Sequence, residues 1–581
     1  MAYKEELAQR RQQILAAMAP KVSSTFGAHA LLATEQDEAT MQRVQELVTT
    51  TFGSQSASPF AVAQMGCFDP FAAMFLLCRW QHRLTDATKD HIKRVMTQDI
   101  HGRGNTENHW LMHYTAQLLA AERYTDIDTW WNGLPRQTYH AEASRWITGT
   151  IERTARIGHH EYDSTDYHGW HVLPMIALAD HAADPLLRQR ARDMATLLIG
   201  DMALEYFKGG WAGGHAREGY RENTWTAVGS SATLLYLYFG GPSFGPMQAH
   251  QAMAPALTAE YEPPAILAAI AHDRQQPRVV KKTKAPRTIY RHVKRESSPV
   301  YKTTYTNRSF ALGTTQTGLP GAPAGPIDLV SWDLTWEGPK HEAKIVSCHP
   351  YTDPGRFSAF LSELPQRIGV SVPAAKPYLQ FADRLFGASP YEQMMQHENA
   401  AILLYRIPPE DDHPYVNLYL PCTTAWRRDG QLLWGDTGQF YVFIRLLGAC
   451  KWEYVKDADY IDGWVLRLCG ALTGLVLEAC EMDSYSDFDA FVSAAPAAAD
   501  NLSDPVSHTT QTGAHLEMTY DGAHRVNGEA IDYSTWKLYE APEAQAELDS
   551  GRVHFEHEGQ SLRLDFGIDP TQPLIPMRVI G

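Results

Sequence analysis

The sequence has few cysteines and no cysteine pair. Its seven cysteines are odd in number and scattered over 581 residues, and no two of them form a CxxC pair. Disulfide frameworks and zinc ribbons need cysteines in even numbers or at close spacing. We therefore expect free thiols, and we expect no metal or other cofactor.

Long apolar runs are missing as well. No stretch reaches the roughly 18 apolar residues that a membrane-spanning helix needs. Residues 1–19 are rich in charged and amide side chains and lack the apolar core of a signal peptide. These absences predict a cytoplasmic protein without membrane contact, unless an export signal has been trimmed from the sequence.

Positive charge is in deficit. The chain has 51 Lys and Arg against 67 Asp and Glu, which gives a net charge of −16. Because nucleic-acid-binding chains are usually basic, we do not expect a nucleic-acid partner. An acidic substrate stays open, since the local field of a cleft matters more to such a ligand than the net charge of the whole chain.

Residues 1–275 show apolar side chains at helical spacing, and β-alternation is nearly absent from them. The expected helices are 39–50, 91–97, 108–122, 139–156, 173–183, 185–207 and 224–239. Many antiparallel helices of similar length, without a sequence repeat of fixed period, predict a toroid of helical hairpins, an (α/α) toroid.

From residue 301 to residue 581 the pattern becomes that of short strands. The expected strands are 301–306, 309–315, 329–336, 400–406, 415–420, 440–446, 464–468, 475–481, 515–520 and 562–566, separated by Asp-Gly and Asn-Gly turns. Such a series predicts an antiparallel β-sandwich. The basic, proline-containing stretch 276–300 is interpreted as an interdomain linker, with a basic lip beside a cleft as the alternative. The fold class is therefore α+β with two domains.

Side chains that can transfer protons gather in three stretches at expected helix ends. Residues 105–109 read Asn-Thr-Glu-Asn-His, residues 161–171 read Glu-Tyr-Asp-Ser-Thr-Asp-Tyr-His-Gly-Trp-His, and residues 215–221 read His-Ala-Arg-Glu-Gly-Tyr-Arg. A structural helix start needs one capping side chain and not a row of acid–base groups. We predict that the three stretches meet in one cleft that handles a sugar polymer.

These motifs resemble those of heparinase II/III-like proteins. The resemblance rests on residues 105–110, 161–167 and 211–217 for the helical half, and on residues 305–313 and 396–402 for the β-rich half. It implies an (α/α) toroid followed by an antiparallel β-sandwich. It also implies a polysaccharide lyase that acts on uronate polymers. Some relatives hold zinc in the β-domain, for which the candidates here would be His341, Cys348, His349 and His397.

Eliminative cleavage of a uronide needs a group that neutralises the sugar carboxylate, a base that removes the neighbouring proton, and an acid that protonates the leaving oxygen. We expect Asn108 and Arg217 to bind the carboxylate and Tyr167 to shuttle the proton, assisted by His168 or His215. The remaining expected substrate contacts are His109, Glu161, Trp170, His171, Trp211, Tyr220 and Arg221. The expected partner is an acidic oligo- or polysaccharide, and a homo-oligomer is left open.

Two other functions fit the same residues. A glycoside hydrolase would need two carboxylates, roughly 5 Å apart for retention or roughly 6.5–9.5 Å apart for inversion. Its candidates are Glu107, Glu161, Asp163, Asp166 and Glu218. A non-catalytic carbohydrate-binding protein would keep the aromatic side chains of Trp170, Trp211 and Trp225 while its proton donors lay apart.

Each motif also has a purely structural interpretation. Asn105 would cap the helix that follows it. His109 and His113 lie four residues apart on one helical face, a spacing that suits a metal but is more often found in packed cores. Arg217 and Glu218 would form a surface pair. The clustering of polar groups at three helix ends favours the functional interpretation.

Overall fold

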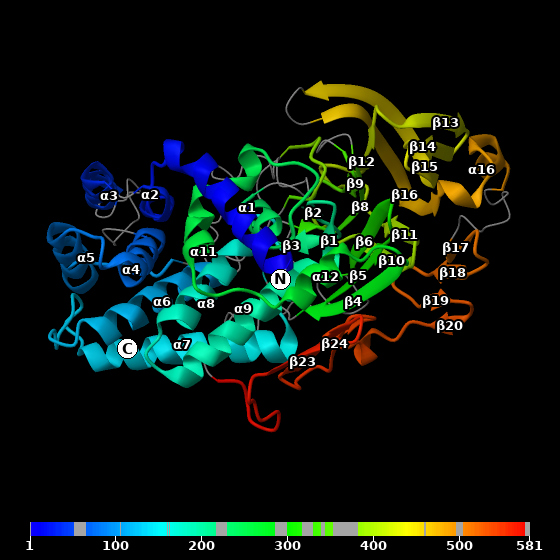
Figure 1. Ribbon diagram of the computed structural model, residues 1–581. Helices are drawn as coiled ribbons and strands as arrows, with labels where there is room; N and C mark the ends of the chain where they lie inside the picture. Colours follow the sequence, from blue (N-terminus) through cyan, green and yellow to red (C-terminus); the bar gives the residue numbers. More distant parts are fainter. Residues whose placement is uncertain are drawn as a thin grey trace.

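The computed structural model describes residues 2–35, 37–51, 66–104, 106–159, 161, 163–216, 229–284, 299–316, 329–338, 343–352, 381–457, 461–494 and 504–575. Helices gather at one side of the molecule and strands at the other (Figure 1). The chain is thus an α+β protein with large antiparallel sheets. The toroidal and sandwich arrangements stay predictions.

The helices of the first half follow the expected pattern with a few additions. They are α1 Ala2–Met18, α2 Ala28–Thr34, α3 Glu38–Thr51, α4 Phe68–Trp80, α5 Asp86–Gln98, α6 Glu107–Arg123, α7 Arg136–Ile157, α8 Gly169–His181, α9 Pro185–Glu205, α10 Ser231–Phe239, α11 Ala254–Thr258 and α12 Ala265–His272. Six expected helices, α3 and α5–α9, are confirmed with shifted ends. The seventh, 224–239, is described only from Ser231 onward, and α1, α2, α4, α11 and α12 were not predicted.

Helices α6 and α8 are buried along nearly their whole length. Helix α8 is apolar on nearly every side, as is typical of an interior helix. Helix α6 buries polar side chains as well, among them Glu107, Asn108 and Gln117. Both helices pack against one another and start at the same end of the helical layer, where the loop 161–168 leads into α8. The first turns of α6 and α8 therefore carry the residues of the candidate site into the centre of the helical half.

The described strands are β1 Tyr206–Phe207, β2 Gly210–Trp211, β3 His215–Ala216, β4 Arg278–Lys284, β5 Val300–Thr306, β6 Phe310–Gln316, β7 Leu329–Val330, β8 Trp332–Trp336, β9 Lys344–Cys348, β10 Glu392–His397, β11 Ala400–Tyr405, β12 Val416–Pro421, β13 Ala425–Asp429, β14 Leu432–Asp436, β15 Phe440–Asp457, β16 Ile461–Glu481, β17 Val506–Thr509, β18 His515–Met518, β19 His524–Val526, β20 Glu529–Ala530, β21 Tyr539–Ala541, β22 Ala544–Ala546, β23 Arg552–His557 and β24 Gln560–Asp565. A short helix, α16 Phe488–Ala494, precedes β17.

Most strands belong to one 16-stranded antiparallel sheet. Strand β16 is continuous over Ile461–Glu481, whereas the sequence predicted two strands, 464–468 and 475–481, in that region. Its first half pairs with β12 and its second half with β11. A bulge in the β15–β16 pairing between Leu447 and Ala449 marks the change of partner. Side chains of β6 and β8 share one apolar core with those of β11, β12 and β16.

The stretch interpreted as a linker contains a strand. Residues Arg278–Lys284 form β4, which pairs with β5 on one side and with β21 on the other. Five of its side chains are buried, and Lys282, Thr283 and Lys284 are among them. The prediction of a solvated linker is therefore wrong for these residues, and residues 285–298 lie outside the described part of the chain.

The C-terminal strands pack against the helices and share their core. The close approach is made at Gly200 of α9, where an added Cβ would lie 2.5 Å from the ring of Phe555 in β23. Strands β21 to β24 join the large sheet through β4. Strand β4 thus links the central sheet to strands β21 to β24, of which β23 and β24 contact α12 (Figure 1).

Two local features agree with what the sequence predicts. All seven cysteines are free, as their scattered positions predict. Asn527 and Gly528 both adopt positive φ angles, 51° and 83°, in the turn between β19 and β20, which is the conformation that an Asn-Gly hairpin turn requires. Within the described residues, no helix is long and apolar enough to cross a membrane.

Candidate active site

The first turn of α6 brings Asn108 into a fully buried position. Thr106 is the N-cap residue of this helix, and Asn105, the residue expected to cap it, lies outside the described residues. The side-chain amide of Asn108 donates to Oε2 of Glu161 over 2.8 Å. Two of the three predicted stretches are therefore joined by a direct hydrogen bond.

Glu161 receives a second hydrogen bond from the first turn of α8. Nε2 of His171 lies 2.8 Å from the same carboxylate oxygen, Oε2. Glu161 is 0% exposed and His171 is 2% exposed, so the charge of the carboxylate is screened by these donors and not by water. We call Asn108, Glu161 and His171 the buried network.

A second histidine supports this network from the end of α7. The ring of His159 packs edge-on against His171, with 4.0 Å between the ring centroids. The sequence interpretation did not single out His159. The sequence offered one indication of its role, since His159 lies two residues before Glu161. A loop that buries a carboxylate also tends to bury the residues next to it.

His168 is fully buried and is held in one orientation. Its Nε2 donates to the carbonyl oxygen of Leu198 over 3.0 Å, so Nδ1 carries the lone pair. Burial lowers the pKa of His168 from 6.5 to about 4, so the imidazole is neutral at physiological pH. Its ring packs edge-on against Trp211, 4.7 Å away, which connects the stretch 161–171 to β2.

More exposed side chains lie around the buried network. Phe68 packs edge-on against both His109 and Trp170, with centroid separations of 5.1 and 4.9 Å. Tyr167 is half-buried, and its backbone N–H donates to Oγ of Ser164 over 2.9 Å. Because Tyr167 and His109 are partly exposed, they are the predicted residues of these two stretches that a ligand can reach most directly.

His215 lies on β3, which pairs with β7 beside the large sheet. Its Nδ1 donates to the carbonyl oxygen of Gly213 over 2.8 Å. Burial lowers the pKa of His215 to about 4, so this imidazole is neutral as well. The remaining predicted residues of this region lie outside the described residues: Arg217, Glu218, Tyr220, Arg221 and Trp225.

Behind the loop 161–168 lies a fully buried set of charges that the sequence interpretation missed. We call it the ion cluster; its members are Asp163, Asp201, Glu205, Lys282, Lys284 and Lys302. Glu205 lies 3.0 Å from Lys282 and from Lys302, and Asp201 lies 3.0 Å from Lys284. The cluster joins the end of α9 to β4 and β5.

Asp163 ties the site loop to the ion cluster. It forms an ion pair with Lys302, and its backbone has a φ of 52°, a left-handed conformation that is uncommon for residues other than glycine. Burial alone would raise the pKa of Asp163, but Lys282, Lys284 and Lys302 together hold it well below its ordinary value. Asp163 is therefore a permanent anion two residues from Glu161.

The described residues contain no group of three or more His, Cys, Asp or Glu side chains placed to hold a metal ion. In the β-rich half, both ring nitrogens of His349 have other partners, since Nδ1 lies 2.7 Å from Oγ of Ser389 and Nε2 lies 3.0 Å from the carbonyl oxygen of His413. The thiol of Cys348 donates to backbone carbonyls. Of the two other zinc candidates, His341 lies outside the described residues and His397 is the last residue of β10.

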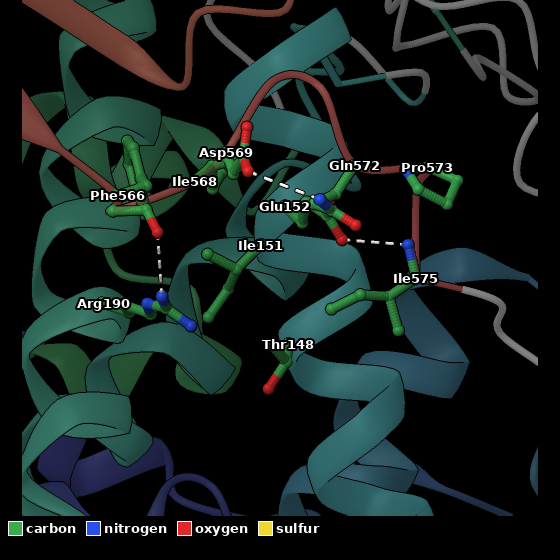
Figure 2. Close-up of a pocket in the computed structure, with 11 residues that line it drawn as sticks. Thr148, Ile151, Glu152, Arg190, Phe566, Ile568, Asp569, Gln572, Pro573 and Ile575 are labelled. Atoms are coloured by element: carbon green, nitrogen blue, oxygen red, sulfur yellow. Dashed lines mark hydrogen bonds between the residues drawn. The ribbon is translucent and has the colours of Figure 1, made fainter.

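A separate pocket of about 210 Å³ lies between α7, α9 and the C-terminal segment (Figure 2). Glu152 accepts a hydrogen bond from the backbone of Ile575 over 3.0 Å, and Arg190 donates to the carbonyl of Gly567 over 3.4 Å. None of the residues predicted for the site lines this pocket. Its polar groups anchor the C-terminal segment to the helices.

Comparisons with known proteins give distant likenesses only. No family model matches the chain, and no curated protein matches it. One similar solved structure is the chondroitin AC lyase of Streptomyces coelicolor A3 in complex with chondroitin sulphate, with 11% identity, a TM-score of 0.40, and coverage of 95% of this chain and 87% of that chain. A tyrosine-to-alanine mutant of the same enzyme gives 9% identity, a TM-score of 0.32 and the same coverage. Both TM-scores lie below 0.5, so these likenesses carry no conclusion about the function of this chain.

Proposed function

We propose that this chain is a carbohydrate-active enzyme, a lyase that cleaves uronate-containing oligo- or polysaccharide by β-elimination. The observation that carries the proposal is the buried network of Asn108, Glu161 and His171 at the meeting point of two helix starts. Burying a carboxylate costs folding free energy, and hydrogen-bond donors such as Asn108 and His171 must offset that cost. Glu161 lies in the same loop as Tyr167 and His168, a few residues before them in the sequence, which supports a role in the site.

Tyr167 is the proposed proton shuttle, and His215 or His168 assists it. A half-buried phenol can reach a ligand, whereas both imidazoles are neutral and therefore able to accept a proton. Asn108 and Arg217 were predicted to neutralise the sugar carboxylate. Since Asn108 is buried and donates to Glu161, we now assign it to holding the site loop, and Arg217 keeps the role of carboxylate binder.

The carboxylates of the region favour elimination over hydrolysis. A glycosidase needs a carboxylic acid that stays protonated until it donates to the leaving group. Asp163 is held ionised by three lysines, and Glu161 is occupied by Asn108 and His171. This leaves the buried Glu107 and the half-buried Asp166 among the described residues, with Glu218 outside them, so the hydrolase is the alternative.

The deciding experiment offers the purified protein a panel of uronate glycans and follows both ultraviolet absorbance and product size. Elimination creates a carbon–carbon double bond conjugated with the carboxylate, which absorbs in the ultraviolet, and hydrolysis does not. We expect absorbance to rise together with the appearance of shorter products. Shorter products without absorbance would overturn the lyase in favour of the hydrolase, and binding without cleavage would favour the non-catalytic binding protein.

A further inference from the structure

Arg103 stands at the start of the candidate site and belongs to none of the three predicted stretches. It lies in the loop between α5 and α6, directly before Gly104. Gly104 has a φ of 73°, and an added Cβ would lie 2.5 Å from Nδ1 of His109. The loop therefore packs directly on His109, which keeps Arg103 at the same end of α6 as Asn108.

Two indole rings fix the side chain of Arg103. Its guanidinium carbon lies 5.2 Å from the ring centroid of Trp110 in α6 and 5.2 Å from that of Trp146 in α7. The rings of Trp110 and Trp146 lie edge to face with their centroids 5.2 Å apart, and Tyr114 stacks on Trp146 at 5.0 Å. Cation–π contacts hold an arginine without using its N–H groups, and the Tyr114 hydroxyl takes a hydrogen bond from only part of the guanidinium group of Arg103. Because the side chain of Arg103 is already held in place, it loses less conformational entropy when an anion binds to it.

Among the described residues, the guanidinium group of Arg103 lacks an anionic partner. Within the described part of the chain, no carboxylate forms an ion pair with Arg103, although Arg156 and Arg94 on neighbouring helices each have one. Glu142, the acidic residue of this aromatic group, accepts a hydrogen bond from the Tyr114 hydroxyl over 2.7 Å. The nearby His113 carries no charge, since burial first, and then the charges of His101 and Arg103, lower its pKa to about 3.

We propose that Arg103 is a subsite for an oxyanion of the substrate, either the carboxylate of a uronate residue or a sulfate ester. Arginine presents paired N–H groups in a plane, a geometry that matches two oxygens of such a group. Arg103 is half-buried, so the charge is partly desolvated and yet open to solvent on one side. The identity of the ligand rests on the proposed function. The subsite itself does not, because the guanidinium group of Arg103 lacks a carboxylate partner among the described residues whatever reaction the protein catalyses.

The test compares the affinity of an unsulfated uronate tetrasaccharide with that of the same tetrasaccharide after reduction of its carboxyl groups, measured by calorimetry. We expect Arg103→Gln to weaken binding of the acidic form about tenfold, the cost of one charge-assisted pair, and to leave the reduced form unchanged. Arg103→Lys should recover part of the loss. The matched control is Arg145→Gln, because Arg145 is an exposed arginine on α7 next to Trp146, and its affinities should stay within twofold.

Inorganic sulfate provides an arm that needs no glycan. We expect sulfate to bind the wild-type protein and Arg145→Gln, and to bind Arg103→Gln at least several-fold more weakly. If sulfate binds through Arg103 while no uronate glycan binds or is cleaved, the proposed function fails and the oxyanion subsite stands. If glycans are cleaved with a rise in absorbance while Arg103→Gln and Arg145→Gln behave alike toward both tetrasaccharides and sulfate, the subsite is overturned and the lyase stands. Equal weakening of the acidic and reduced forms would also overturn it, since a purely structural arginine affects both alike.

Discussion

The amide of Asn108 donates to the carboxylate of Glu161 over 2.8 Å, across 53 residues of sequence and with neither side chain exposed. This bond joins the start of α6 to the loop that leads into α8. Because Glu161 also accepts from His171, one carboxylate oxygen fixes the relative position of two helix starts. The half-buried Tyr167 projects from the loop that this bond holds.

Replacement of Glu161 by glutamine should lower both stability and activity. A glutamine oxygen in the place of Oε2 can still accept from Asn108 and His171, but it carries no charge, so both buried hydrogen bonds lose their charge assistance. We expect the free energy of unfolding to fall by about 1–3 kcal/mol, measured by urea denaturation. Glu5→Gln on the exposed side of α1 is the control and should unfold at the wild-type urea concentration. Equal midpoints for Glu161→Gln and the wild type would contradict the role of the network.

Tyr167→Phe tests the proton shuttle without changing the shape of the side chain. The variant lacks only the phenolic oxygen, so folding and substrate affinity should be almost unchanged while elimination falls at least about a hundredfold, the usual contribution of a general acid or base. The rate is followed by ultraviolet absorbance and the affinity by calorimetry. Full activity of Tyr167→Phe would move the shuttle to His168, His171 or His215, which would be tested next.

Lys302→Met should be among the most destabilising single substitutions in the chain. Methionine has a similar volume, but it leaves the buried carboxylates of Asp163 and Glu205 short of one positive charge. Removing one member of a buried ion pair typically costs about 3–5 kcal/mol, and chemical denaturation would measure it. The comparison is Lys93→Met, which breaks an exposed pair with Asp126 and should leave the denaturation midpoint almost unchanged. A similar response of the two variants would show that the ion cluster adds no more than a surface pair.

The buried histidines predict acid sensitivity in a defined pH range. Burial lowers the pKa of His168, His215 and His524 from 6.5 to about 4. Between pH 6.5 and pH 4 these histidines bind protons in the unfolded chain but not in the folded chain. The free energy of unfolding is therefore highest above pH 6.5 and decreases as the pH falls toward 4. Urea denaturation at several pH values should show this fall. His524→Gln should make the fall in stability with pH shallower, because the substitution removes one of the contributing imidazoles. His524 lies outside the candidate site, so the site itself stays unchanged. A free energy of unfolding independent of pH over this range would contradict these pKa shifts.

Helix positions were predictable where local rules decide them. Helix α9 starts at Pro185 after the capping residue Asp184, whose side chain accepts from the backbone of Leu186. Helix α4 was missed because its interior is apolar on nearly every side, which removes the three- and four-residue rhythm that marks an amphipathic helix. Strand β16 was divided in two because Gly470 and Gly474 interrupt its pattern. Residues 470–473 have no partner in β15, and the pairing with β15 resumes at Gly474.

The candidate site was predictable only in part. The sequence located the stretches that carry Asn108, Glu161 and His171, because polar side chains concentrated at helix starts are recognisable without coordinates. It assigned Asn108 to the substrate, whereas the structure buries this side chain against Glu161. It missed His159 and Arg103 altogether, since their contacts are to rings that lie far along the chain or on a neighbouring helix.

The sequence by itself determined that helices precede antiparallel strands, that the thiols are free, and where polar groups meet helix ends, because periodicity, spacing and capping act over a few residues. Only the tertiary structure decided the state of the charges. Lys282 and Lys284 have the composition of a solvated linker, and they are buried because Asp163, Asp201 and Glu205 approach them from α9 and from the loop before α8. Whether a charge is solvated or paired depends on which distant groups the fold brings to it, and no local pattern records that.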